Sequence, residues 1–492
     1  MNFITPERAG LSSRDLLAFY QELDAHNLST HAVMMSRGDA LFTECYYAPF
    51  HKDFKHRMYS VSKSFVAVAV GFCLQDGLLR LSDHLLDFFE DYVKAGKVKV
   101  QHNSSIEDML KMQTTIEGSM NWFKVVEDDR TAVYFDAPAV KHPGAIFSYD
   151  SSATYMLGVI VERVTGKPFL EYLKDKALRE IGFSEDAYCL QCPGGNSWGD
   201  SGVMCTATDL LLFARFVLNK GTWQGKRYLN AEFLEKAVSA LGCTNIYGFF
   251  DHDTSYGYLF WGSPKGCFAM NGMGCQIALC DPTHDLVFVI NSDNQGNGHG
   301  YQQIFEPFYR HVFDKLTPNG QSLPEDPEAQ AELAAYLADR KLFFLPGATQ
   351  NPWSERVAGK VFECDENAMG LKWFRLDFAG DVGTFTYENA QGEKSFVFGF
   401  GHNEFGKFPE EGYSDLVGTV YEPGHYYDAA FSADWPVENN LRIRVQIIDK
   451  YFGNMGILIG FVDENTVSLR MEKKAEAFLN EYRGIANGKA RE

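Results

Sequence analysis

The sequence contains no long hydrophobic run and no excess of positive charge. No window of the 492 residues reaches the roughly 18 apolar residues that a membrane-spanning helix needs. Met1–Arg8 has no apolar segment like the core of a signal peptide. With 65 acidic against 45 basic residues, the chain lacks the basic patches that nucleic acids and anionic membranes require. We therefore expect a cytoplasmic protein that binds neither.

Cysteine patterns typical of a metal centre are also lacking. Cys189-Leu-Gln-Cys192 has the spacing of a metal or redox pair, but no second Cys or His pair follows at a zinc-site distance. Cysteines such as Cys73 and Cys280 fall within apolar runs, as expected for small core residues in a reducing compartment. Because the chain also has no dinucleotide fingerprint, we expect no metal and no cofactor.

Two glycine-rich motifs lack the context that would give them a function. Gly199-Asp-Ser-Gly202 resembles the nucleophile loop of trypsin-like proteases, but it leads directly into a helical pattern. No β-rich half carrying a histidine precedes it. Gly401-His-Asn-Glu-Phe-Gly-Lys-Phe408 mimics a phosphate loop but lacks the Ser or Thr that would bind magnesium. We assign a function to neither motif.

The apolar periodicity predicts an α+β fold with one antiparallel sheet built from both ends of a domain. Two strands on either side of Arg37-Gly38-Asp39 come first, and four strand-like segments cluster at 256–262, 267–270, 275–281 and 286–291. Helical patterns dominate between them, among them 152–164 and 207–218. We therefore predict an antiparallel sheet flanked by helices, with an inserted helical subdomain.

Proline and glycine residues mark a domain boundary between residues 317 and 350. Beyond it the sequence alternates between strand and turn patterns, which predict a small all-β domain, either a barrel or a twisted sheet. We predict a first domain over residues 1–320, a helix and linker over 321–350, and the C-terminal β-domain over 351–492. A final amphipathic helix is predicted at about 474–482.

The segment Ser60-Val-Ser-Lys63 opens an apolar helical run that ends at Gly77. A spacing of three residues places Ser60 and Lys63 on one helix face, within contact distance. A serine hydroxyl becomes a good nucleophile when a neighbouring base takes its proton, and a lysine is such a base where burial lowers its pKa. The helix start also offers N–H groups for an oxyanion. By itself, however, this short motif is equally compatible with a capping serine beside a solvated lysine.

Two further segments supply candidate partners for this pair. Tyr149 and Ser151 lie in a loop at the predicted helix start near 152, and a tyrosine near a cationic lysine loses its proton more readily. Asn271 and Gly272 lie in a glycine-rich strand segment, where small residues allow the backbone to approach a ligand closely. Each segment alone is also compatible with a purely structural role.

Taken together, these segments resemble the penicillin-recognising serine hydrolases: class C β-lactamases, D-aminopeptidases, related esterases and 6-aminohexanoate-dimer hydrolases. The resemblance extends over roughly residues 5–315, in the order found in the family. It rests on MYSVSKSFVAVAVG, HPGAIFSYDSSATYMLGVIVERVTG, GDSGVMCTATDLLLFARFVLNKGTWQGKRYL, YGYLFWG and NGMGCQIALCDP. It implies a β-lactamase-like fold, to which the C-terminal domain adds a β-domain of the kind appended to some of these hydrolases.

The resemblance also implies the role of each site residue. Ser60 would be the nucleophile, Lys63 the base that activates it, and Tyr149 the group that passes the proton to the leaving group. The oxyanion would be held by the N–H of Ser60 and by one from the closing strand, which we place at Asn271, next to Gly272. Ser151 replaces the asparagine of the family's tyrosine loop and still donates a hydrogen bond.

One departure bears on the substrate. The Lys-Thr-Gly strand motif, whose lysine helps to bind the carboxylate of penicillins and peptide ends, is missing; Phe268-Ala-Met270 or nearby residues replace it. This favours an ester or amide of a small molecule or short peptide over a β-lactam. Two alternatives stay open: a non-catalytic binding or sensor protein on the same fold, and a β-lactamase. The C-terminal domain has three candidate roles, namely capping the cleft, forming a homo-oligomer and binding a ligand.

Overall fold

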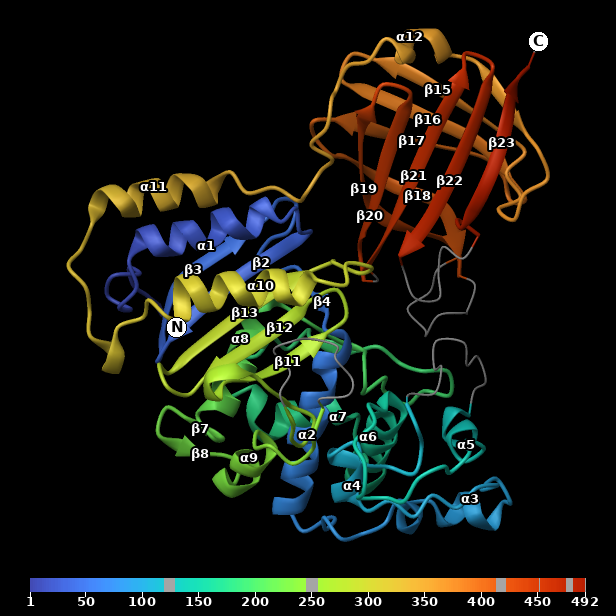
Figure 1. Cartoon of the computed structure of the whole chain (residues 1–492). Helices are drawn as coiled ribbons and strands as arrows, with labels where there is room; N and C mark the ends of the chain where they lie inside the picture. The colour runs from blue at the N-terminus through green and yellow to red at the C-terminus, as the bar shows by residue number, and fades with distance from the viewer. Residues whose placement is uncertain (119–128, 245–254, 413–421, 451, 475–480, 492) are drawn as a thin grey trace. The chain divides into compact units, whose positions relative to one another are not determined.

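The structure is a computed structural model that describes residues 1–118, 129–244, 255–412, 422–450, 452–474 and 481–491. The chain divides into two units, Met1–Lys341 and Leu342–Glu492 (Figure 1). The division falls inside the 321–350 segment that the sequence marks as helix and linker. Within the described residues, no helix is both long and apolar enough to cross a membrane.

The first unit is built on an eight-stranded sheet, counted over the described residues, that joins the start of the chain to residues 255–292. The pairing of β2 with β13 at its centre and the other neighbouring pairs are antiparallel, except for β1 and β3, which pair in parallel. This is the predicted antiparallel sheet made from both ends of the unit. In sheet order its strands are β1 (Asn2–Phe3), β3 (Ala40–Tyr46), β2 (Thr30–Arg37), β13 (Leu286–Ser292), β12 (Gln276–Asp281), β11 (Phe268–Gly272), β10 (Trp261–Gly262) and β9 (Ser255–Tyr256).

Helices cover both faces of this sheet, which explains why β2, β12 and β13 are buried along their whole length. Because strand residues alternate in direction, Met35 packs with α1 and α10 in one core, whereas Met34 contacts Thr208 of α8. Two sequence patterns, 152–164 and 207–218, correspond to α6 and α8. The helices of this unit are α1 (Ser13–Ala25), α2 (Ser62–Gln75), α3 (Glu90–Lys94), α4 (Ile106–Leu110), α5 (Arg130–Tyr134), α6 (Ser151–Thr165), α7 (Phe169–Leu173), α8 (Ala207–Leu218), α9 (Ala231–Ala237), α10 (Gly300–Phe308) and α11 (Pro327–Ala338).

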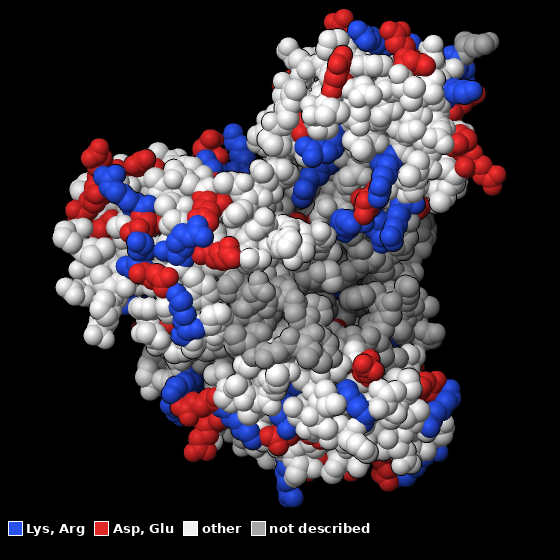
Figure 2. Space-filling view, viewed as in Figure 1, with Lys and Arg blue, Asp and Glu red and all other residues white. Residues whose placement is uncertain are grey.

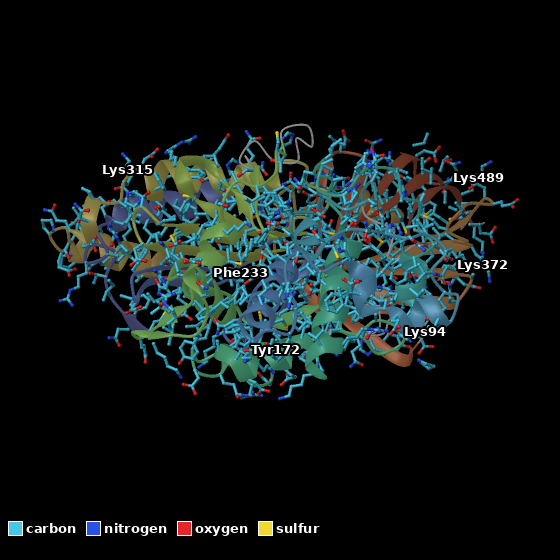
Figure 3. The ribbon with its side chains drawn as sticks, turned by 90° about the horizontal axis from the view of Figure 1, so that it is seen from below. Lys94, Tyr172, Phe233, Lys315, Lys372 and Lys489 are labelled. Carbon is cyan, nitrogen blue, oxygen red and sulfur yellow. The ribbon has the colours of Figure 1, made fainter. Side chains whose placement is uncertain are left out.

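The helix α2 is apolar all round and buried from Ser62 to Cys73, as expected of a helix enclosed by its neighbours. Its Gly71 lies against the ring of Phe233 on α9, the residue labelled in Figure 3. A Cβ at Gly71 would come 2.4 Å from the nearest ring carbon. The glycine therefore allows the two helices to pack closely.

We expect Gly71→Ala to lower the free energy of unfolding by about 1–3 kcal/mol, because the added methyl overpacks the contact with Phe233. In a Phe233→Ala background the same substitution should be neutral or stabilising, since alanine favours the helix. Gly158→Ala in α6 is the matched control, as its Cβ would meet nothing closer than 3.8 Å. Urea denaturation of the four variants measures the coupling; additive effects of Gly71 and Phe233 would contradict it.

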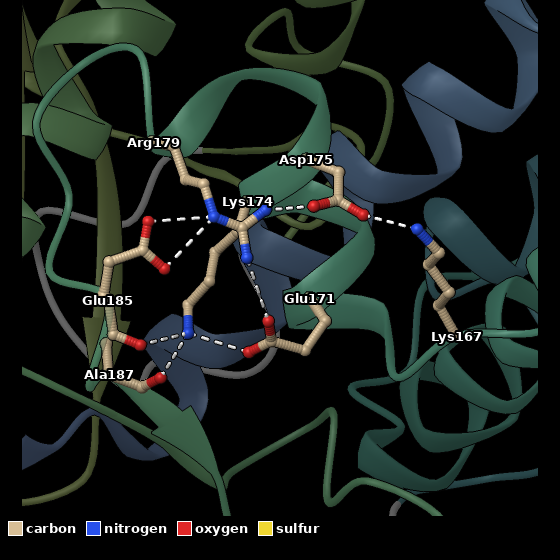
Figure 4. Close-up of polar contacts among 7 residues, drawn as sticks. All are labelled: Lys167, Glu171, Lys174, Asp175, Arg179, Glu185 and Ala187. Atoms are coloured by element: carbon tan, nitrogen blue, oxygen red, sulfur yellow. Dashed lines mark hydrogen bonds and ion pairs between the residues drawn. The ribbon is translucent and has the colours of Figure 1, made fainter.

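A small three-stranded sheet lies beside the helical subdomain. In sheet order its strands are β4 (His56–Arg57), β6 (Val203–Cys205) and β5 (Tyr188–Cys189). Lys174, at the start of a π-helical turn after α7, is 3% exposed. Its Nζ donates to the carbonyls of Glu185 and Ala187 at 2.8 and 2.7 Å and to Glu171 Oε1 at 2.7 Å (Figure 4). Since its ammonium has three acceptors, the buried charge is satisfied and fixes the segment that enters β5.

Over its described residues, the second unit is all-β apart from the short helix α12 (Trp353–Val357). Its ten strands, counted over the described residues, form one sheet that the parallel pairing of β17 with β19 closes into a barrel. The strands are β14 (Val361–Cys364), β15 (Trp373–Ala379), β16 (Val382–Asn389), β17 (Gly392–Phe400), β18 (Glu404–Gly412), β19 (Glu422–Val437), β20 (Asn440–Ile448), β21 (Phe452–Asp463), β22 (Thr466–Lys474) and β23 (Gly484–Ala490).

The strand patterns in the sequence miss four of these strands, β14, β18, β19 and β23. The predicted terminal helix at 474–482 falls mostly on 475–480, outside the described residues, and Lys474 itself ends β22. Acidic and basic side chains intermingle on the face in Figure 2. On that face the net charge of −20 is therefore not gathered into one acidic patch.

Candidate active site

Ser60 lies in a 3-10 turn, Tyr59–Val61, that leads directly into α2. The residue before it, Tyr59, has a φ of 48°, a left-handed conformation that costs a non-glycine residue roughly 1–3 kcal/mol. The ring of Tyr59 is buried, with the guanidinium carbon of Arg57 4.2 Å from its centroid. Packing therefore maintains a strained backbone that turns the chain immediately before Ser60.

Lys63 is buried at 1% exposure and contacts Ser60 as the spacing predicts. Its Nζ donates to Ser60 Oγ at 2.9 Å and to the carbonyl oxygen of Asp200 at 2.7 Å. The ammonium also lies 5.3 Å from the centroid of the Tyr149 ring. The amine, the hydroxyl and the phenol ring thus form one cluster, although Tyr149 comes from a segment far away in the sequence.

The segment that bears Asp200 is bonded to the start of α2 on both sides of Ser60. Met58 N donates to the carbonyl oxygen of Val203 at 2.8 Å, and Val203 N donates to Ser62 Oγ at 3.0 Å. These bonds continue the pairing of β4 with β6. The Asp200 carbonyl is therefore held in a fixed position relative to the Lys63 ammonium.

Tyr149 packs face to face with Trp261 of β10, with centroids 5.5 Å apart and an interplanar angle of 18°. Tyr149 is half-buried, so one side of its ring is open to the cavity above Ser60. Ser151 is the first residue of α6 and is absent from the described lining of that cavity. Its predicted role in substrate binding stays a prediction.

Between these two residues, the buried Asp150 caps α6 and fixes the tyrosine loop. Its carboxylate accepts hydrogen bonds from Thr114 Oγ1 at 2.9 Å, from Ala153 N at 3.2 Å and from Ser152 Oγ. Burial raises the pKa of Asp150 to about 6, and the hydrogen bonds from Ser152 and Thr114 only partly oppose this rise. The folded protein therefore holds this proton more tightly than the unfolded chain does.

This raised pKa predicts a specific pH dependence of stability. Between pH 4 and 6 the folded state binds more protons than the unfolded state, so the free energy of unfolding falls as the pH rises. The loss attributable to Asp150 is about 3 kcal/mol. Asp150→Asn keeps an acceptor oxygen but does not titrate, so this decline should disappear from urea denaturation at pH 4 to 7.5. Asp136→Asn, at an exposed ion pair, should keep it, and an unchanged decline in Asp150→Asn would contradict the assignment.

The closing strand β11 lies directly against the Ser60 backbone. A Cβ placed on Gly272 would be 2.4 Å from Met58 O and 3.3 Å from Ser60 N. Asn271, the predicted position of the second oxyanion amide, precedes it and is 4% exposed. Only glycine lets the strand lie this close to the turn that carries the serine. The choice of Asn271 as the amide donor stays a prediction.

We expect Gly272→Ala to lower kcat/KM for ester hydrolysis at Ser60, the predicted nucleophile, by about 10- to 100-fold. The added methyl group must push β11 away from the Ser60 turn, and a shift of about 1 Å is enough to disturb catalytic geometry. Stability should fall by about 1–3 kcal/mol. Gly456→Ala, on a strand of the second unit where the Cβ meets nothing within 4 Å, is the control. Unchanged hydrolysis of an activated ester by a folded Gly272→Ala protein would contradict the close approach.

These residues surround a cavity of about 420 Å³. Ser60, Tyr149, Asn271 and Gly272 line it, and Lys63 lies buried beneath Ser60. Further residues that line the cavity, among them Trp261, Gln295, Asn297 and Tyr301, were not identified as site residues from the sequence. Tyr301 OH donates a hydrogen bond to the Gly272 carbonyl and so fixes the end of β11. Asn294-Gln-Gly-Asn-Gly298 follows β13 and has no motif that would have identified it.

The sequence analysis also missed Asp200. It lies in the Gly199-Asp-Ser-Gly202 motif, which we set aside because it lacks a protease context. Among the described residues, no group of three or more His, Cys, Asp or Glu side chains is arranged to hold a metal ion.

Comparison with known proteins matches residues 16–304 to the family model described as Beta-lactamase. A curated 6-aminohexanoate-dimer hydrolase from Paenarthrobacter ureafaciens is 25% identical over 284 residues, covering 53% of this chain and 71% of that protein. A solved structure described as a candidate 6-aminohexanoate-dimer hydrolase from Bacillus anthracis superimposes with a TM-score of 0.50 at 21% identity, covering 62% of this chain and 83% of the other. The structure of EstCE1, a hydrolase with promiscuous acyltransferase activity, covers 61% and 100% with a TM-score of 0.49 and 13% identity.

Proposed function

The chain belongs to the Beta-lactamase family, and from that premise we propose that it is a serine hydrolase that cleaves an ester or amide bond in a small molecule or short peptide. The observation that carries the proposal is the 2.9 Å contact between Lys63 Nζ and Ser60 Oγ. Ser60 lines the cavity. The name of the curated relative, 6-aminohexanoate-dimer hydrolase, supports the same class of reaction, a hydrolysis.

In the proposed reaction, Ser60 Oγ attacks the substrate carbonyl carbon while its proton passes to the neutral amine of Lys63. The negative charge that develops on the carbonyl oxygen is stabilised by the Ser60 N–H and by one N–H from β11. The bond to the leaving group breaks, and Tyr149 OH delivers a proton to the departing alcohol or amine, recovering one from the Lys63 ammonium. Water then attacks the acyl-serine by the reverse sequence of proton transfers and releases the acid.

Two features of the site favour this chemistry. Lys63 is almost fully excluded from water, and its Nζ contacts Ser60 Oγ rather than bulk solvent. The aromatic faces of Tyr149 and Trp261 and the amide groups of Asn271 and Gln295 line the space in front of Ser60, a combination of apolar and hydrogen-bonding groups typical of small-molecule sites.

A fluorophosphonate probe together with a panel of esters and amides tests the proposal. We expect covalent labelling of Ser60, identified by peptide mass spectrometry, and turnover of at least one activated ester. A chromogenic cephalosporin in the same panel tests the β-lactamase alternative. A folded protein that neither reacts with the probe nor turns over any substrate would refute the proposed function and favour a binding role.

A further inference from the structure

The Gly199–Val203 loop contains a buried carboxylate that the proposed reaction does not use. The Asp200 side chain belongs to a residue that is 2% exposed, and its Oδ1 has no hydrogen-bond partner among the described residues. The Asp200 carbonyl is 2.7 Å from Lys63 Nζ, so standard covalent geometry places the carboxyl group of the same residue within about 8 Å of the ammonium. A buried carboxylate persists only where nearby charges compensate it.

Three cations from three different elements provide that compensation. Burial raises the pKa of Asp200, and the positive charges of Lys63 on α2, Arg130 on α5 and Arg57 on β4 oppose this rise, in that order of size. Arg57 also holds the loop itself, because its Nε and Nη2 donate to the carbonyl and hydroxyl oxygens of Ser201, both at 3.0 Å. The carboxylate thus lies amid three positive charges.

The two thiols near Asp200 add no negative charge to that of its carboxylate. Cys189 and Cys192 also lie within electrostatic range, and burial is the main cause that raises the pKa of both thiols, which therefore stay protonated. On the opposite side of Lys63 lie the hydroxyl of Ser60 and the ring of Tyr149. The negative charge of Glu162 contributes to the raised pKa of the two cysteine thiols. Asp200 therefore supplies the negative charge of this loop that acts on Lys63, while its backbone carbonyl makes the direct contact.

We propose that the Asp200 carboxylate is the buried counter-ion of Lys63 and acts as a positioning residue for the proton transfer from Ser60. This inference rests on the proposed function. Without the carboxylate, Arg57 and Arg130 would disfavour a proton on Lys63, and the amine would be too weak a base for the serine. With it, the cluster carries enough negative charge for Lys63 to accept the proton from Ser60 Oγ and pass it on to Tyr149.

The test compares the pH profile of kcat/KM for an activated ester in the wild type, Asp200→Asn and Arg130→Gln. The acidic limb reports the protonation of Lys63, which must be neutral to act as a base. Removing the negative charge should move this limb about one pH unit lower, and removing the arginine should move it higher. At a pH within the acidic limb, kcat/KM of Asp200→Asn, expressed as a fraction of its own maximum at high pH, should be about ten times the corresponding fraction for the wild type. Asp186→Asn, an exposed partner of Lys55, should leave the limb in place.

An NMR titration separates this inference from the proposed function. Lysine is labelled at ¹³Cε, and the Lys63 resonance is assigned by its loss in Lys63→Arg. The titration midpoint of Lys63 can then be measured whether or not the protein turns over substrate. Absence of Ser60-dependent hydrolysis would refute the proposed function alone. If the Lys63 titration midpoint moves down in Asp200→Asn and up in Arg130→Gln, the counter-ion proposal is supported even without hydrolysis. An unmoved midpoint in a folded variant would overturn it, and Arg130→Gln decides the question if Asp200→Asn does not fold.

Discussion

Replacing Ser60 with alanine is expected to lower kcat/KM by about 10⁴- to 10⁶-fold, the loss typical of a nucleophile that acts as one unit with its base. The substitution removes the only atom that forms the acyl bond in the proposed reaction, and Ser60 Oγ is the hydroxyl to which Lys63 donates among the described hydrogen bonds. Fluorophosphonate labelling should be lost in parallel. Because Ser60 is half-buried and only its Oγ is removed, the thermal midpoint should stay close to that of the wild type.

Ser239→Ala provides the matched control, since this exposed serine bonds only to the Lys236 carbonyl among the described contacts. The control should retain both activity and labelling. If Ser60→Ala is labelled as well as the wild type, or keeps more than a tenth of its activity, Ser60 is not the nucleophile.

Lys63→Arg is expected to produce a loss of comparable size, at least about 10³-fold in kcat/KM. Arginine keeps the positive charge but cannot give up its proton in a protein, and therefore cannot accept the serine proton. The loss should appear mainly in kcat, because the role of Lys63 lies in bond formation rather than in substrate binding. Stopped-flow kinetics with an activated ester would resolve the slow acylation step.

Lys94→Arg on α3 is the corresponding control, because this lysine is exposed and pairs only with Glu90 among the described contacts. The control should be indistinguishable from the wild type. If Lys63→Arg retains full activity while folded, a fixed positive charge suffices at this position, and the base must be sought elsewhere.

The local part of the site could be predicted from the sequence, whereas the long-range part could not. Ser60 and Lys63 are three residues apart, so helical geometry alone brings them together. Asp200 lies 137 positions from Lys63 in the chain, and its contact depends on the pairing of β4 with β6. The predicted strand ends at residue 270, whereas β11 extends to Gly272. The contact of Gly272 with the Ser60 turn results from how β11 packs, which periodicity does not encode.

The fold shows the same division between local and long-range information. The segment 256–262 is predicted as one strand but forms β9 and β10, because Leu259 has a φ of 61° and its backbone bonds outside the sheet. Its carbonyl accepts from Ser64 Oγ at 2.7 Å, and its N–H donates to Leu110 O at 3.1 Å. In the second unit, β18 contains Pro409 where its register with β19 shifts. Proline in an irregular strand obscures the alternating pattern.

The strand order of the first unit has a consequence for protein synthesis. The ribosome releases Ser60 and Lys63 early, but β11, which packs against the Ser60 turn, belongs to a sheet whose last strand, β13, ends only at Ser292. Domains generally fold as units during translation, so a nascent chain carries the serine and the lysine long before it has the strand that completes the pocket. In the proposed enzyme, reactivity toward cellular esters would therefore begin only after translation has passed the last strand of the sheet.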